Sequence, residues 1–149
     1  MNNFQVIFVS DVIDMDVDNV WQKLCAFDEF ADFFPAGMRC RYLYQTPSGP
    51  GSVRRIDMPE GYVEEQLIAL AEESHTLEYL MLATSLPVGN YRAKIVLKPI
   101  TQGERTFIEW RASFTADHPE PAQLAEEIRE HVFITAINGM KKYFHADNA

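Results

Sequence analysis

One glutamate in the middle of the chain lies among apolar neighbours. The run Gly61-Tyr62-Val63-Glu64-Glu65-Gln66-Leu67 is typical of a strand, and because side chains alternate along a strand, Val63, Glu65 and Leu67 share one face. A carboxylate in that position must be paired, hydrogen-bonded or raised in pKa, and all three conditions are common at ligand sites. Glu65 is therefore a candidate for acid–base chemistry or ligand binding. A purely structural ion pair with Arg54 is the equal alternative.

Other side chains are candidates to line a site with this glutamate. Of the neighbours Arg54 and Arg55, one must face the concave side of the sheet, although an exposed arginine is the usual case. Tyr91 could offer its phenol to a ligand or pack in the core. Tyr79 and Trp110 have the same two interpretations, because large aromatic residues at strand spacing pack more often than they recognise ligands.

A group of phenylalanines between the first strand and the sheet region is also ambiguous. Phe27, Phe30, Phe33 and Phe34 could form the mouth of a cavity or a simple core.

The sequence contains none of the strong catalytic or cofactor motifs. Gly49-Pro50-Gly51 opens like a dinucleotide-binding loop but lacks the third glycine and lies between strands. A P-loop, HExxH, a nucleophile elbow and CxxC are all missing. The histidines His118, His131 and His145 are scattered, so neither a metal nor a cofactor is expected.

Composition and charge exclude several classes of protein. The 149 residues include 13 Lys+Arg and 22 Asp+Glu, a formal net charge of -9. Nucleic acid and anionic membrane surfaces both require clustered cations, so neither is an expected partner. Cys25 and Cys40 are too few for a disulfide scaffold. The N-terminus has no signal-peptide pattern and no apolar run approaches the ~20 residues that span a bilayer, so a cytoplasmic location is expected.

The elements that position these residues can be predicted from periodicity. Phe4–Ile13 alternates like a strand, Asp16 or Asp18 can cap a helix over Val17–Phe27, and aromatic spacing predicts a second short helix over Asp28–Phe34. Strand-length apolar runs between turn residues predict six further antiparallel strands, at Met38–Gln45, Ser52–Met58, Tyr62–Ala71, His75–Ala83, Tyr91–Pro99 and Arg105–Thr115.

After Pro121 the apolar period changes to about 3.6 residues. The apolar face includes Leu124, Ile128, Val132 and Thr135 on one line, with Phe133, Ile137, Met140 and Phe144 beside it. This predicts a C-terminal helix of about 24 residues, about 36 Å long, lying across the sheet. The expected architecture is a single α+β domain over residues 1–149.

Weak motifs follow one another along nearly the whole chain in the order of a known family. They are Ser10, Ile13, Val20-Trp21, Phe27 and Pro35, then Gly51-Ser52-Val53-Arg54, Gly61, Glu65-Gln66-Leu67, Pro87-Val88-Gly89-Asn90-Tyr91, Glu109-Trp110, Phe114 and Asn138-Gly139-Met140-Lys141. The sequence thereby resembles the START/Bet v 1-like (SRPBCC) superfamily, in its polyketide cyclase/dehydrase and lipid-transport branch. The resemblance implies a helix-grip fold, in which a curved seven-stranded antiparallel sheet grips the long helix around a cavity for an apolar molecule.

The same stretch is similar to the plant abscisic acid receptors. That similarity implies that Glu65 and Tyr91 line a pocket and that two mobile loops fall at Asp57–Gly61 and Ser85–Val88. Those loops lack the gate and latch signatures, and no lysine matches the one that holds the hormone's carboxylate. A hormone-receptor role is therefore not expected.

Three functions are compatible with the sequence. The first is binding of a hydrophobic or amphipathic ligand, oriented by Glu65, Arg54 and Tyr91. The other expected ligand-binding residues are Tyr79, Trp110, Phe30, Phe34 and Ile137. The second is a cyclase or dehydratase in which Glu65 removes a proton next to a carbonyl and Arg54 or Tyr91 stabilises the enolate. The third is an interaction protein with a collapsed cavity, whose phenylalanines form a partner or homodimer surface.

Overall fold

The computed structural model describes residues 3–147, and its elements follow the predicted order. They are β1 (Phe4–Ile13), α1 (Val17–Cys25), η1 (Phe27–Phe33), β2 (Arg39–Tyr44), β3 (Val53–Met58), β4 (Gly61–Ala71), β5 (Thr76–Thr84), β6 (Val88–Ile100), β7 (Arg105–Ala116), α2 (Pro121–Ile128), η2 (Arg129–Ile134) and α3 (Thr135–Asp147). The first helix ends at Cys25 instead of the predicted Phe27, because the chain turns there into the 3-10 helix η1.

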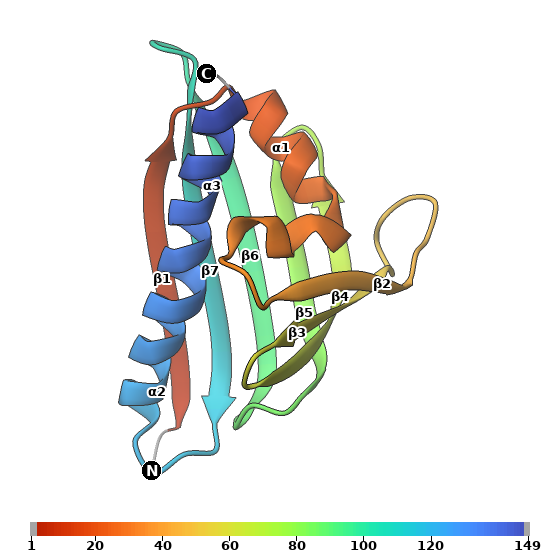
Figure 1. Cartoon of the computed structure of the whole chain (residues 1–149), viewed down its shortest axis with the longest axis vertical. Helices are drawn as coiled ribbons and strands as arrows, with labels where there is room; N and C mark the ends of the chain where they lie inside the picture. Colours follow the sequence, from red (N-terminus) through yellow and green to blue (C-terminus); the bar gives the residue numbers. More distant parts are fainter. Residues whose placement is uncertain (1–2, 148–149) are drawn as a thin grey trace.

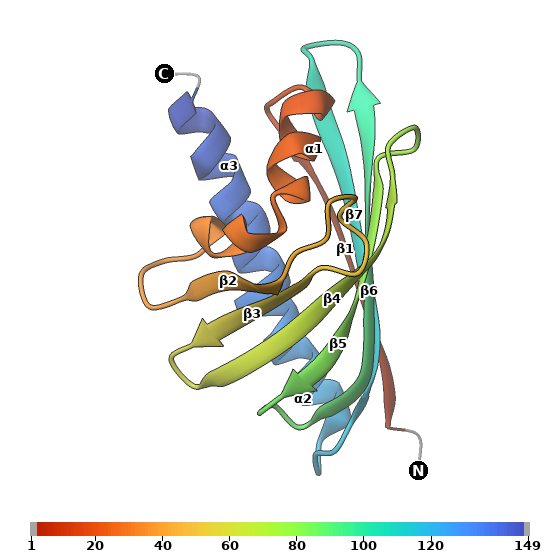
Figure 2. The same cartoon turned by 90° about the vertical axis from the view of Figure 1, so that its right-hand side faces the viewer.

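All seven strands form one antiparallel sheet in the order β1-β7-β6-β5-β4-β3-β2. Strands β2 to β7 pair with their neighbours in sequence, and β1 pairs with β7. The sheet curves, and the helices all lie on its concave side (Figures 1 and 2). The predicted helix-grip fold is confirmed.

A buried lysine holds the two short helices to the C-terminal helix, and an aspartate caps the first of them. Asp16 caps α1 by accepting a hydrogen bond from the backbone of Asn19 at 3.2 Å, as one of the two predicted caps. Lys23 on α1 pairs with Asp32 of η1 at 2.6 Å, and its ammonium lies 4.4 Å from the ring centroid of Tyr143 on α3. One side chain therefore joins three helices.

The long C-terminal helix differs from the expected uninterrupted α-helix. Between α2 and α3, the segment η2 is π-helical, and the Thr135 hydroxyl donates to the carbonyl of Glu130 at 2.9 Å. A π-helical turn holds more residues than an α-helical turn, so it rotates the apolar face of α3 relative to that of α2. Ile137 and Met140 consequently face the core, whereas Ile128 and Val132 are only partly buried.

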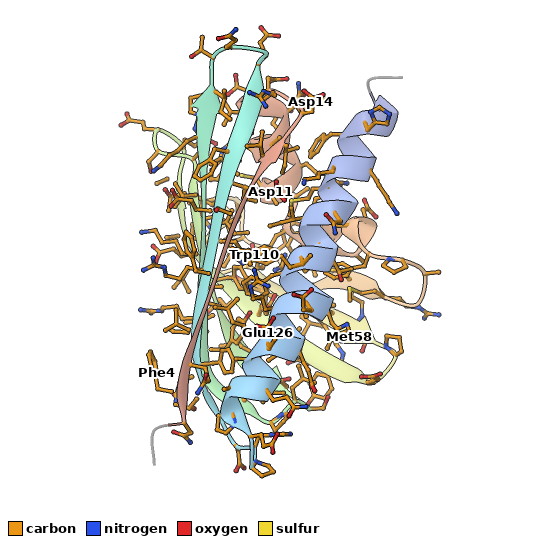
Figure 3. The ribbon with its side chains drawn as sticks, turned by 90° about the vertical axis from the view of Figure 1, so that its left-hand side faces the viewer. Phe4, Asp11, Asp14, Met58, Trp110 and Glu126 are labelled. Carbon is orange, nitrogen blue, oxygen red and sulfur yellow. The ribbon has the colours of Figure 1, made fainter. Side chains whose placement is uncertain are left out.

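The core lies between the concave face of the sheet and the helix. Trp110 on β7 is fully buried there and stacks on Phe133 of η2, with ring centroids 4.2 Å apart. Figure 3 shows Trp110 in this layer and Phe4 on the outer side of β1. Gly139 allows α3 to touch η1, since a Cβ on this residue would lie 1.6 Å from the carbonyl oxygen of Phe33.

Candidate functional site

A small cavity of about 50 Å³ lies between the concave face of the sheet and the C-terminal helix. Three methionines, Met38, Met58 and Met81, contribute to its wall. The helix contributes Ile128 and Val132, which are partly buried residues of its apolar face. Because a buried water needs about 10–15 Å³ of such space, the cavity has room for only a few waters.

Among the described residues, Glu65 is the only charged side chain on the wall of this cavity. It comes from the middle of β4, and strand alternation places it on the concave face with Val63, as predicted. The other polar side chains on the wall are the phenols of Tyr79 on β5 and Tyr91 on β6. A carboxylate and two phenols therefore face an otherwise apolar space.

Arg54 neutralises Glu65 from the neighbouring strand β3, where the two residues are register partners. Its Nε and Nη2 atoms lie 2.9 Å and 2.8 Å from the same carboxylate oxygen, Oε1, and Nη1 donates to the carbonyl of Phe27 at 3.0 Å. Within residues 3–147 no side chain or backbone group donates a hydrogen bond to the second oxygen, Oε2. Half of the carboxylate is therefore available to a ligand.

Burial acts against the charge on Glu65. Only 5% of Glu65 and 3% of Arg54 are exposed. Burial raises the pKa of Glu65, and the charge and hydrogen bonds of Arg54 lower it by less. The carboxylate is thus easier to protonate than an exposed glutamate.

The guanidinium of Arg54 is enclosed by aromatic rings. Its central carbon lies 3.8 Å from the ring centroid of Phe27, 4.6 Å from that of Phe30 and 5.1 Å from that of Tyr79. Such cation–π contacts stabilise a buried arginine. Arg54 borders a second space of about 10 Å³ beside Lys23 instead of the main cavity.

The two phenols on the wall differ in their hydrogen bonding. The Tyr79 hydroxyl accepts a hydrogen bond from Trp110 Nε1 at 3.2 Å. Burial is the largest cause that raises the pKa of Tyr79, and the negative charge of Glu65 is the next. Burial, followed by Tyr79 and Glu65, raises the pKa of Tyr91 well above 10.0. Both phenols are therefore neutral at pH 7. No described residue forms a hydrogen bond with the Tyr91 hydroxyl. The ring of Tyr91 stacks on Phe114.

The structure brings five of the predicted site residues to the cavity wall and places three behind it. On the wall are Glu65, Tyr79, Tyr91, Phe30 and Phe34. Three residues lie behind the wall. Arg54 donates a hydrogen bond to Glu65, Trp110 donates one to Tyr79, and Ile137 packs in the core.

Phe30 and Phe33 have exposed fractions of only 7% and 3%, so both are core residues, and Phe30 also lines the cavity. Neither ring is exposed as the partner surface of the third expected function would require, whereas Phe34 is only partly buried. The exposed phenylalanines are Phe4 and Phe8, on the outer face of β1.

Sequence reasoning missed the three methionines of the wall. Alternation from Arg54 and Ile56 along β3 places Met58 on the same face, and alternation from Tyr79 along β5 does the same for Met81. The signal was therefore present for these two. Met38 was predicted to begin the strand Met38–Gln45, but β2 begins at Arg39, so alternation does not place its side chain.

Comparisons with known proteins agree with this architecture. A family model described as "Polyketide cyclase / dehydrase and lipid transport" matches residues 6–144. The chain belongs to this family. No curated protein matches the sequence.

Solved structures place the chain in the same fold. XoxI from Bacillus cereus is 18% identical with a TM-score of 0.79, and the match covers 100% of this chain and 99% of that one. Ara h 8.0201, a Bet v 1-like protein, is 15% identical with a TM-score of 0.76, over 96% and 99% of the chains. Norcoclaurine synthase from Thalictrum flavum, in complex with dopamine and hydroxybenzaldehyde, is 15% identical with a TM-score of 0.73, over 96% and 87%.

These comparisons support the START/Bet v 1-like superfamily, but they do not confirm the finer similarity to the plant abscisic acid receptors. Across residues 3–147, no helix has the length and apolarity needed to cross a bilayer. The same residues contain no group of three or more His, Cys, Asp or Glu side chains that could hold a metal ion.

Proposed function

We propose that this protein binds a hydrophobic or amphipathic small molecule in the cavity between the sheet and the C-terminal helix. The observation that carries the proposal is the Oε2 atom of Glu65, which has no hydrogen-bond partner among the described residues and belongs to a buried side chain that faces an otherwise apolar space. A hydrogen bond stabilises such a carboxylate oxygen, and a bound ligand or water can donate one. Family membership supports the same class of function.

The ligand must enlarge the cavity as it enters. A volume of about 50 Å³ is well below the roughly 150 Å³ that holds benzene and the roughly 300–1,000 Å³ of drug-sized sites. Met38, Met58 and Met81 supply this adaptability, because methionine is unbranched and changes rotamer at little cost. Leu86, in the connection between β5 and β6, also lines the cavity.

Native mass spectrometry of the purified chain with a panel of fatty alcohols, sterols and aromatic compounds tests the proposal. We expect at least one compound to be retained in a one-to-one complex. A Val88→Phe variant, which fills the cavity from β6, should lose it. Val96→Phe, the same change on the outer face of the same strand, is the matched control and should retain it. Failure of the whole panel to bind would contradict the proposal.

A second candidate function is proton transfer by Glu65, as in a cyclase or dehydratase. Two observations favour it: Oε2 is available, and burial raises the pKa of Glu65. A general base works best when its pKa lies near the ambient pH. Tyr91 is better placed than Arg54 to stabilise an enolate, because Tyr91 lines the cavity whereas Arg54 lies behind Glu65. Turnover of a β-diketone that disappears in Glu65→Gln while binding persists would support this function.

A further inference from the structure

The polar groups of the cavity wall show which ligand chemistry the site can satisfy. Glu65 Oε2 can only accept a hydrogen bond while the carboxylate is charged. The Tyr79 hydroxyl already accepts from Trp110, so its own proton is left to donate. The Tyr91 hydroxyl can donate or accept. A ligand group that donates to Glu65 meets the main requirement, and a hydroxyl can in addition accept from a phenol.

A ligand carboxylate would meet no available cation in this cavity. Arg54 lies behind Glu65, with Nε and Nη2 on Oε1 and Nη1 on the Phe27 carbonyl, and it does not border the cavity. The other basic side chain buried near the site, Lys23, pairs with Glu29 and Asp32 on the far side of Arg54. The charged group that faces the cavity is therefore the Glu65 carboxylate, with the two phenols beside it and Arg54 behind it.

We infer that the cavity selects ligands whose buried polar group is a hydrogen-bond donor, an alcohol, phenol or amine, and rejects the matching carboxylic acids. This inference rests on the proposed binding function and names its ligand class. Two carboxylates in one low-dielectric site cannot both be ionised, so an acid could bind only if it or Glu65 took up a proton. The net charge of -9 adds a weaker repulsion in the same direction.

The test compares three ligands that share one ten-carbon chain: decan-1-ol, decylamine and decanoic acid. Isothermal titration calorimetry with the full chain at about pH 7.5 measures the three dissociation constants. We expect the alcohol and the amine to bind at least roughly 100-fold more tightly than the acid, because sites with buried polar groups discriminate strongly against mismatched partners. Binding of the acid as tightly as the alcohol would overturn the inference and leave the binding function intact. Binding of none of the three, nor of the wider panel, would overturn both.

A pair of variants locates the selectivity in Glu65. In Glu65→Gln the wall loses its charge, and we expect the preference for alcohol over acid to fall at least about tenfold. Because this variant leaves Arg54 buried without a counter-charge, Arg54→Met/Glu65→Leu removes the whole pair and should give the same loss of preference. Glu64→Gln, one residue away on the opposite face of β4, is the matched control and should keep the wild-type preference. An unchanged preference in the folded double variant would refute the role of Glu65.

Discussion

Two neighbouring ion pairs join the same two strands, β3 and β4, on opposite faces. Arg54 pairs with Glu65 on the concave face and Arg55 with Glu64 on the convex face, each with an N to O distance of 2.8 Å. Both guanidinium groups lie over an aromatic ring, 3.8 Å from Phe27 and 4.1 Å from Tyr62. The concave side chains are 4% and 7% exposed, and the convex ones are 27% and 25% exposed.

The two pairs differ in how much solvent reaches their charged groups. On the convex face water screens the charges, so the pair is replaceable. On the concave face the charges are desolvated, and removal of either partner leaves the other buried and unpaired. Only the concave pair presents a free carboxylate oxygen to a cavity. Strand alternation alone thus gives adjacent residues of the same chemistry a surface role and a site role.

The largest expected effect breaks the concave pair. Arg54→Met leaves Glu65 charged and unpaired, and we expect it to lower the free energy of unfolding by about 3–5 kcal/mol, measured by urea denaturation. The double variant Arg54→Met/Glu65→Leu should recover most of this loss, because it removes both charges. If the single and double variants were equally unstable, the lost packing of Arg54 would be the cause instead of the stranded charge.

Thiol reactivity extends the comparison to uncharged groups beside the helices. Burial, with the charge of Glu72 second, raises the pKa of Cys25 from 9.0 to about 11. Such a rise lowers the thiolate fraction about 100-fold, so we expect Cys25 to react with a disulfide reagent at pH 8 at least about 100-fold more slowly than a model cysteine peptide. Burial also raises the pKa of Cys40, which should be slow too. Rapid labelling of the folded chain at either position would show that these thiols are open to solvent.

The pH dependence of stability tests the burial of Glu65. Since its pKa is raised above 4.5, the folded chain holds this proton more tightly than the unfolded chain. The resulting stabilisation is complete below about pH 4.5 and is lost as the pH rises through the folded-state pKa. The loss is about 1.4 kcal/mol for each pH unit that separates the folded-state pKa from the unfolded-state pKa. Relative to wild type, Arg54→Met/Glu65→Leu should therefore gain stability between about pH 4 and pH 7. A relative loss over that range would mean that Arg54 outweighs burial.

The smallest effect is expected from the convex pair. Arg55→Met removes a cation that solvent screens and whose partners, Asp57 and Glu64, remain partly exposed. We expect its urea midpoint to stay within experimental error of wild type. A loss comparable to that of Arg54→Met would show that burial does not separate the two pairs.

Much of this architecture could be predicted from the sequence, because it rests on local periodicity. The inward face of Glu65 followed from its alternation with Val63 and Leu67, and the structure buries all three. The choice between Arg54 and Arg55 remained open, because it depends on the register that pairs Arg54 with Glu65.

Features that depend on tertiary packing could not be predicted. The π-helical segment Arg129–Ile134 is a distortion of a helix whose residues have ordinary helical spacing. The enclosure of Arg54 by Phe27, Phe30 and Tyr79 joins three separate elements, which no sequence pattern connects. The volume of the cavity depends on side-chain rotamers, so it could not be predicted from the sequence either.

The central claim, that a ligand binds beside Glu65 and enlarges this cavity, is tested most directly by NMR of methyl-labelled methionines. The full chain is titrated with decan-1-ol, and the methyl signals are followed. The account predicts large shifts for Met38, Met58 and Met81 on the cavity wall, and small ones for Met15 and Met140, which pack in the core elsewhere. Saturable shifts confined to Met15 and Met140, or no shift at any methionine, would contradict it.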